Sequence, residues 1–162
     1  MVLTFSIPKR SGSRFTAWPR WIRTASGPSP KTLTLKGIRV LVVDDDADGR
    51  DMMAAALKDF GARVRAVATS RTALAVLRKQ AFNPHILLAD LAMPDVDGYE
   101  LIRSVRMLDA DTARAVPAIA VTAYATPADR VRALEAGYQA HISKPIDPSV
   151  IAASIIGLLP QR

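Results

Sequence analysis

The stretch Ile38-Arg39-Val40-Leu41-Val42-Val43 ends abruptly at Asp44-Asp45-Asp46. It is rich in β-branched residues and shows almost no polar alternation, which is typical of a strand buried on both faces of a parallel sheet. A second stretch, His85-Ile86-Leu87-Leu88-Ala89-Asp90, has the same form and again ends on an aspartate. Together the two stretches predict a parallel sheet with carboxylates at the ends of two of its strands.

The other predicted elements alternate between helix and strand along the chain. Short apolar runs predict three more strands, at 64–68, 116–122 and 140–143. Amphipathic periodicity and capping residues predict five helices, around 53–60, 70–77, 98–108, 127–136 and 148–159. Parallel strands joined by helices form right-handed crossovers that cover both faces of a sheet. The sequence therefore predicts an α/β fold with five parallel strands and five helices.

The N-terminal segment differs in charge and composition from the rest of the chain. The first 37 residues carry seven basic residues and no acidic one, whereas the other 125 carry fifteen of each sign. The whole formal charge of +7 therefore comes from this segment, and nucleic-acid binding is not expected of the neutral remainder. Prolines, glycines and serines without sustained periodicity predict a disordered tail over 1–36 and a folded domain over 37–160.

Composition excludes several classes of protein. The 162 residues suffice for one packed domain, and the absence of cysteine excludes disulfides, iron–sulfur clusters and thiolate catalysis. Two histidines, His85 and His141, are too few and too far apart in sequence for a multi-histidine metal site. The longest apolar stretches, Val116–Ala125 and Val150–Leu159, are much shorter than the roughly 18 residues of a membrane-spanning helix. We therefore expect no membrane span.

Polar residues end or follow four of the predicted strands, namely Asp44 and Asp45, Asp90, Thr122 and Lys144. Because the carboxyl ends of parallel strands share one edge of a sheet, these residues should converge. Three carboxylates in one place repel one another, and a divalent cation such as Mg²⁺ removes that conflict. A lysine and a threonine suit a phosphoryl group in transfer, for which an aspartate can be the nucleophile. Each residue alone has an ordinary structural explanation, such as helix capping, but their combination favours phosphoryl chemistry.

Four motifs connect this interpretation to a known family. They are Val40-Leu41-Val42-Val43-Asp44-Asp45, Leu87-Leu88-Ala89-Asp90-Leu91-Ala92-Met93-Pro94-Asp95-Val96-Asp97-Gly98, Val121-Thr122-Ala123 and Lys144-Pro145. In residue type and spacing they resemble the receiver domain of two-component response regulators, over about three-quarters of the chain. Leu35–Val40 and Ala140–Pro148 look most like the receivers of hybrid histidine kinases. The resemblance implies a flavodoxin-like fold with the strand order 2-1-3-4-5.

The resemblance also implies a role for each site residue. Asp90 would be the phosphoacceptor, and Thr122 and Lys144 would contact the phosphoryl group. The Mg²⁺ ligands would be Asp44, acting through water, Asp45, Asp90 and the backbone carbonyl of Ala92. Thr122 and His141 would form a conformational switch. Gly98 would give backbone freedom at the start of a helix, and the Lys144–Pro145 peptide would be cis.

These roles describe a phosphorelay protein. The phosphoryl donor would be a sensor histidine kinase or a histidine phosphotransfer protein, and the signal would pass to a downstream protein in the cytoplasm. The chain's own chemistry would be limited to self-phosphorylation and self-dephosphorylation, so it would not be an enzyme acting on a separate substrate. Neither His85 nor His141 precedes an acidic residue, as the histidine of a kinase phosphorylation box would.

Two other functions stay open at this point. Asp44-Asp45-Asp46 contains the Asp-x-Asp spacing of a small Mg²⁺-dependent aspartyl phosphatase, although Asp90 and Met93-Pro94 would then have no role. The stretch Phe15–Arg23 interleaves aromatic and basic residues. This pattern would suit a protein whose basic tail binds nucleic acid or associates with a membrane.

Overall fold

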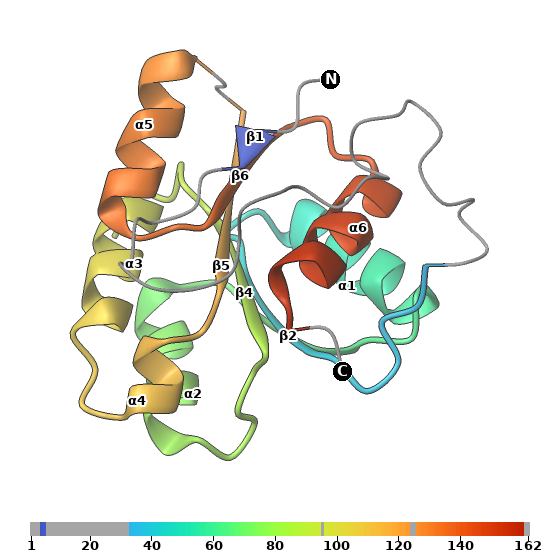
Figure 1. Ribbon diagram of the computed structural model, residues 1–162, viewed down its shortest axis with the longest axis horizontal. Helices are drawn as coiled ribbons and strands as arrows, with labels where there is room; N and C mark the ends of the chain where they lie inside the picture. Colours follow the sequence, from blue (N-terminus) through green and yellow to red (C-terminus); the bar gives the residue numbers. More distant parts are fainter. Residues whose placement is uncertain (1–3, 6–32, 95, 124–125, 161–162) are drawn as a thin grey trace.

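A six-stranded sheet forms the centre of the molecule (Figure 1). The computed structural model describes residues 4–5, 33–94, 96–123 and 126–160. Its strands are β1 (Thr4–Phe5), β2 (Arg39–Val43), β3 (Arg63–Val67), β4 (Ile86–Asp90), β5 (Ala118–Thr122) and β6 (Ala140–Ser143). Strands β2 to β6 pair in parallel in the order β3-β2-β4-β5-β6, which is 2-1-3-4-5 among those five. The predicted flavodoxin-like sheet is confirmed.

Helices cover both faces of this sheet. They are α1 (Ala47–Asp59), α2 (Ser70–Lys79), α3 (Gly98–Arg106), α4 (Asp111–Arg114), α5 (Pro127–Ala136) and α6 (Pro148–Leu158). Helices α1 and α6 lie on one face, and α2, α3 and α5 lie on the other (Figure 1). The sequence predicted five helices, and the described residues hold a sixth, α4, which has four residues. A single turn is too short to show hydrophobic periodicity, which is why it was missed.

The two apolar layers of the core explain the unbroken hydrophobic runs of the strands. In β2, Leu41 and Val43 pack in the layer that contains α2 and α3, whereas Val40 and Val42 pack in the layer that contains α1 and α6. Successive residues of a strand point to opposite faces, so a strand covered on both faces is apolar at every position. Polar side chains can therefore gather only where such strands end.

Two short parts of the segment 1–36, for which the sequence predicts a disordered tail, contact the rest of the domain. Thr4 and Phe5 form β1, which pairs antiparallel with His141 and Ala140 of β6. Leu35 is fully buried, and its N–H donates to the Phe60 carbonyl at 2.7 Å, so this residue just before the predicted boundary at 37 also packs against the domain. Two isolated contacts of this kind leave no periodic signal in a segment otherwise rich in proline and glycine. Residues 1–3 and 6–32 of the predicted tail lie outside the described residues.

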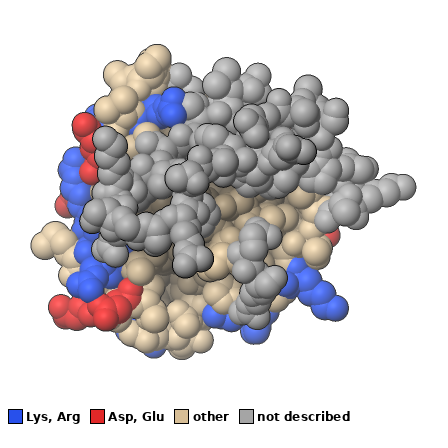
Figure 2. All heavy atoms as spheres, in the orientation of Figure 1, with Lys and Arg blue, Asp and Glu red and all other residues tan. Residues whose placement is uncertain are grey.

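Charged side chains of both signs are mixed on the surface of the domain. Figure 2 shows basic and acidic residues next to one another along the side where α3, α4 and α5 lie. This agrees with the equal numbers of basic and acidic residues after position 37. Among the described residues, no helix has both the length and the apolar composition that crossing a bilayer requires.

Candidate metal and phosphoryl site

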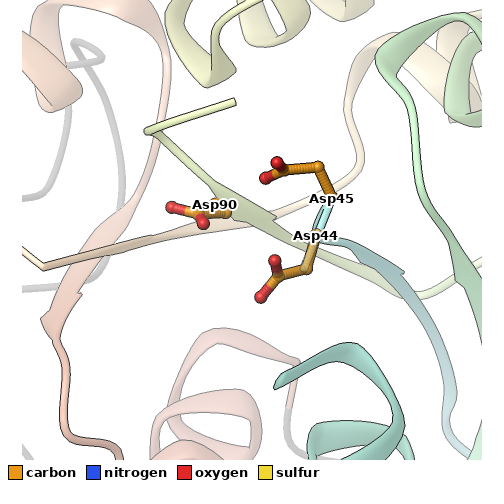
Figure 3. A group of neighbouring side chains, drawn as sticks. All are labelled: Asp44, Asp45 and Asp90. Atoms are coloured by element: carbon orange, nitrogen blue, oxygen red, sulfur yellow. The ribbon is translucent and has the colours of Figure 1, made fainter. Parts of the chain in front are cut away.

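The three predicted carboxylates lie together at the carboxyl ends of two neighbouring strands (Figure 3). Asp44 and Asp45 directly follow β2, and Asp90 is the last residue of β4. One carboxylate oxygen from each residue lies within 4.8 Å of the others. Asp44 and Asp90 are 8% and 6% exposed, whereas Asp45 is open to solvent. The pairing of β2 with β4 therefore brings together acidic groups that are far apart in the sequence.

Hydrogen bonds fix the loop that follows β2. The Asp44 carboxylate accepts from the Asp46 N–H at 3.0 Å, and the Arg50 guanidinium donates to the Asp44 carbonyl at 2.8 Å. Asp46 is exposed and accepts from the Gly49 N–H at 2.8 Å as the N-cap of α1. Of the three consecutive aspartates, the first two therefore belong to the cluster and the third caps a helix.

Asp90 is held at both carboxylate oxygens. Its Oδ1 accepts from the Ala92 N–H at 3.0 Å, and its Oδ2 pairs with Lys144 Nζ at 3.0 Å. Lys144 Nζ also lies 3.5 Å from Asp44 Oδ2. Partial burial alone would lower the pKa of Lys144, but the hydrogen bond and charge of Asp90, together with the charge of Asp44, raise this pKa above its usual value. Lys144 is therefore a firmly charged partner of two carboxylates.

Burial disfavours the ionised form of Asp44. Loss of hydration raises the pKa of Asp44 above its usual value, and the charge of Lys144 offsets only part of that rise. A positive ion beside Asp44 would relieve this penalty. Mg²⁺ prefers hard oxygen ligands with one or two carboxylates and retained water molecules. The donor set of Asp44, Asp45 and Asp90, two buried and one exposed, fits such an ion.

The two predicted switch residues lie on the neighbouring strands β5 and β6. Thr122 ends β5, is 3% exposed, and accepts at its carbonyl from the Lys144 N–H at 2.7 Å. His141 is buried within β6 opposite Ala120 of β5. Its Nε2 has no hydrogen-bond partner in the described part of the chain, and burial lowers its pKa, so the ring is neutral at pH 7. Thr122 thus adjoins Lys144, and His141 lies three residues before that lysine.

Gly98 is needed at the site for a different reason from the one expected. Its φ angle is not in the positive region, so the expectation of unusual backbone freedom is wrong. A Cβ atom at this position would lie 2.5 Å from the Asp90 carbonyl oxygen and 2.9 Å from Leu91 Cα. The close approach of α3 to the end of β4 leaves no space for a side chain. The implied cis peptide between Lys144 and Pro145 is present.

Two features beside the site were not predicted. The hydroxyl of Tyr138 donates to the Gly98 carbonyl at 2.6 Å, a contact between residues 40 positions apart that no local pattern signals. A groove of about 750 Å³ opens beside Asp45, between the start of α2 and the loop after β4. Its walls include Arg71 and Met93. A groove between two loops depends on how they pack, which periodicity does not reveal.

Comparison with known proteins gives consistent matches. The chain matches the response regulator receiver domain over residues 40–156. It is 44% identical over 115 residues to an uncharacterized 14.6 kDa protein in the sodA1 3′ region of Leptolyngbya boryana, covering 71% of this chain and 85% of that protein. It is 26% identical over 156 residues to Histidine kinase 1 of Arabidopsis thaliana, covering 77% of this chain but 13% of the kinase. The structure of chemotaxis protein CheY4 of Vibrio cholerae is similar with a TM-score of 0.69 and 28% identity, over 75% of this chain and 98% of that one.

Proposed function

Because this chain belongs to the family of response regulator receiver domains, we propose that it takes a phosphoryl group from a phosphohistidine onto Asp90 in a Mg²⁺-dependent reaction. Receiver domains are signalling domains that pair with histidine kinases or phosphotransfer proteins. The observation that carries the proposal is the 3.0 Å pairing of the buried Asp90 with Lys144 inside a cluster of three aspartates. A downstream protein partner and a cytoplasmic location are parts of the same proposal.

In this proposal Asp90 is the nucleophile. Its Oδ1 accepts from the Ala92 N–H and its Oδ2 pairs with Lys144 Nζ, so Oδ2 attacks phosphorus as the Lys144 ammonium passes to a phosphoryl oxygen. The new P–O bond replaces the P–N bond to the donor histidine, whose ring takes a proton from water. Asp90 is 6% exposed, so the donor must approach from the open side of the cluster, in line with the attacking oxygen.

Lys144 and Thr122 stabilise the transferred group. The Lys144 ammonium, paired with Asp90 and Asp44 before transfer, pairs with a phosphoryl oxygen afterwards, and its raised pKa keeps it charged. Thr122 ends the adjacent strand β5 and donates its hydroxyl to the same group. Asp45, Asp90 and the Ala92 carbonyl would hold Mg²⁺, with Asp44 acting through water. When bound, the ion supplies positive charge that offsets the phosphoryl oxygens.

The phosphatase alternative is disfavoured by the position of Asp46. An Asp-x-Asp mechanism needs the first and third aspartates of the run at the reaction centre, but Asp46 is exposed and caps α1 through the Gly49 N–H. A receiver, which is phosphorylated and dephosphorylated on its own aspartate, uses the three residues of the cluster and needs no catalytic role for Asp46. The alternative of nucleic-acid binding or membrane association through the tail concerns Phe15–Arg23, which lie outside the described residues.

The proposal is tested by intact mass after incubation with acetyl phosphate and Mg²⁺. Wild type should gain the mass of one phosphoryl group, and the gain should disappear in Asp90→Asn and in the presence of a chelator. Asp46→Asn is the matched control, because asparagine also caps helices well and Asp46 lies outside the cluster. Phosphorylation of Asp90→Asn at the wild-type rate would reject the assignment of the acceptor.

A further inference from the structure

Tyr138 is a buried tyrosine that the phosphotransfer described above does not use. It lies in the turn between α5 and β6, is 2% exposed, and donates its hydroxyl hydrogen to the Gly98 carbonyl at 2.6 Å. Burial raises the pKa of Tyr138 well above its usual value, so the phenol keeps its proton. The hydroxyl is therefore a permanent donor toward the first residue of α3.

Gly98 in turn lies directly against the proposed phosphoacceptor. The Gly98 N–H donates to the Leu91 carbonyl at 3.2 Å, and the site of a Cβ on Gly98 would be 2.5 Å from the Asp90 carbonyl oxygen. Ala92, which follows Leu91 in the chain, donates its N–H to Oδ1 of Asp90. Any shift of Gly98 would therefore displace the backbone that orients the Asp90 carboxylate.

The turn that contains Tyr138 also holds the other end of α3. The Arg106 guanidinium donates to the Gly137 carbonyl from Nε at 3.1 Å and from Nη2 at 2.8 Å. Nη2 donates to the Gln139 side-chain oxygen at 3.0 Å as well, and the Gln139 N–H donates to the Ala118 carbonyl of β5 at 2.9 Å. Helix α3 is thus fastened at its first and last residues to the turn that begins β6, and β6 leads to Lys144.

We propose that Tyr138 is a positioning residue of the phosphotransfer site, whose hydroxyl fixes Gly98, and through it the loop after Asp90, relative to β6 and Lys144. This inference rests on the proposed function and adds a residue that touches neither the phosphoryl group nor the metal. The Asp90–Lys144 distance is then set by two connections. One is the β4-β5-β6 ladder, and the other is the Tyr138–Gly98 hydrogen bond.

The test is Tyr138→Phe, which keeps the ring in the core and deletes only the hydroxyl. We expect a folded protein whose rate of phosphorylation by acetyl phosphate, at saturating Mg²⁺, falls about two- to tenfold, the effect of one hydrogen bond. Amide exchange of Leu91, Ala92 and Gly98 should accelerate by a similar factor, while exchange in β2 and β3 stays unchanged. A general loss of stability would instead accelerate exchange in all strands together.

Tyr99→Phe is the matched control, since it removes the phenol hydroxyl of another tyrosine, the residue after Gly98 in α3. Phenylalanine keeps the ring over which the Arg132 guanidinium lies at 4.3 Å, and this variant should match wild type in both measurements. The inference is overturned if Tyr138→Phe leaves rate and local exchange unchanged, or if Tyr99→Phe changes them equally. If wild type itself is not phosphorylated, the proposed function fails, and the exchange measurement still decides whether Tyr138 positions the loop.

Discussion

The charges around Asp90 account for the chemistry that the cluster favours. With all three aspartates ionised, the cluster carries three negative charges and Lys144 supplies one positive charge at 3.0 Å and 3.5 Å from two of them. The remaining excess of two negative charges is the amount that one divalent cation neutralises. Burial of Asp44 raises its pKa, because the charged carboxylate is unfavourable there without a nearby cation. Cation binding and ionisation of this residue should therefore favour each other.

The contact of Gly98 with Asp90 leads to a prediction about stability. Gly98→Ala places a methyl group 2.5 Å from the Asp90 carbonyl oxygen, which backbone atoms cannot easily avoid. We expect the free energy of unfolding to fall by about 1–3 kcal/mol, the usual cost of overpacking. Urea unfolding measures this as a lower midpoint at an unchanged slope.

Gly157→Ala is the control for this substitution. Gly157 lies near the end of α6, and an added Cβ would meet nothing within 4 Å. Alanine favours a helix over glycine, so this variant should gain about 0.5–1 kcal/mol. Equal effects of the two substitutions would show that the spacing between Gly98 and Asp90 does not limit stability.

At the residue scale, the convergence of the polar side chains could be predicted from their positions along the strands. Asp44, Asp45, Asp90 and Lys144 were expected to lie together because each ends or closely follows a predicted strand, and parallel strands end at one edge. The contact of Tyr138 could not be predicted, because its hydroxyl donates to a carbonyl 40 residues away in the sequence, and helix packing brings the two together. Contacts made by long side chains across the core have no period that a single sequence displays.

At the scale of elements, the two edges of the sheet are protected differently. The outer strand β3 carries exposed Arg63 and Arg65, and charged residues of this kind discourage another strand from pairing there. The strand β6, at Ala140–Ser143, contains no Asp, Glu, Lys or Arg and would be an open edge among strands β2 to β6. β1 pairs with this edge, so the two ordered residues of the N-terminal segment occupy the place where a second chain could add a strand.

Replacing both residues of β1 with proline should uncover this edge. The double variant Thr4→Pro and Phe5→Pro has no N–H to donate to β6, so the pairing at Ala140 and His141 should be lost. We expect amide exchange in β6 to accelerate roughly tenfold, as for the loss of a backbone hydrogen bond or two. Exchange in β3, at the opposite edge, is the internal control. Unchanged exchange in β6 would mean that β1 does not protect this edge.

At the scale of the whole molecule, the layered fold followed from the sequence because its strands are buried on both faces. Val40 to Val43 alternate between two separate apolar layers, and such a run is typical of a parallel sheet with helices on both sides. The short helix α4 and the strand β1 were not predicted, because four and two residues are too few to establish a period. In the sheet, β5 and β6 follow β4, the strand of Asp90, on the side from which Lys144 reaches Asp90.

This arrangement predicts where the molecule responds to phosphorylation. Beryllofluoride with Mg²⁺ imitates a phosphoryl group on Asp90, and Thr122 should move toward it. The Thr122 carbonyl is bonded to the Lys144 N–H at 2.7 Å, and buried His141 lies three residues earlier, so the change should reach α5, β6 and α6. We expect amide chemical-shift changes in those elements and at Thr4 and Phe5, which pair with β6. Asp90→Asn should show none of them, and changes confined to α1 and α2 would contradict a switch through Thr122 and His141.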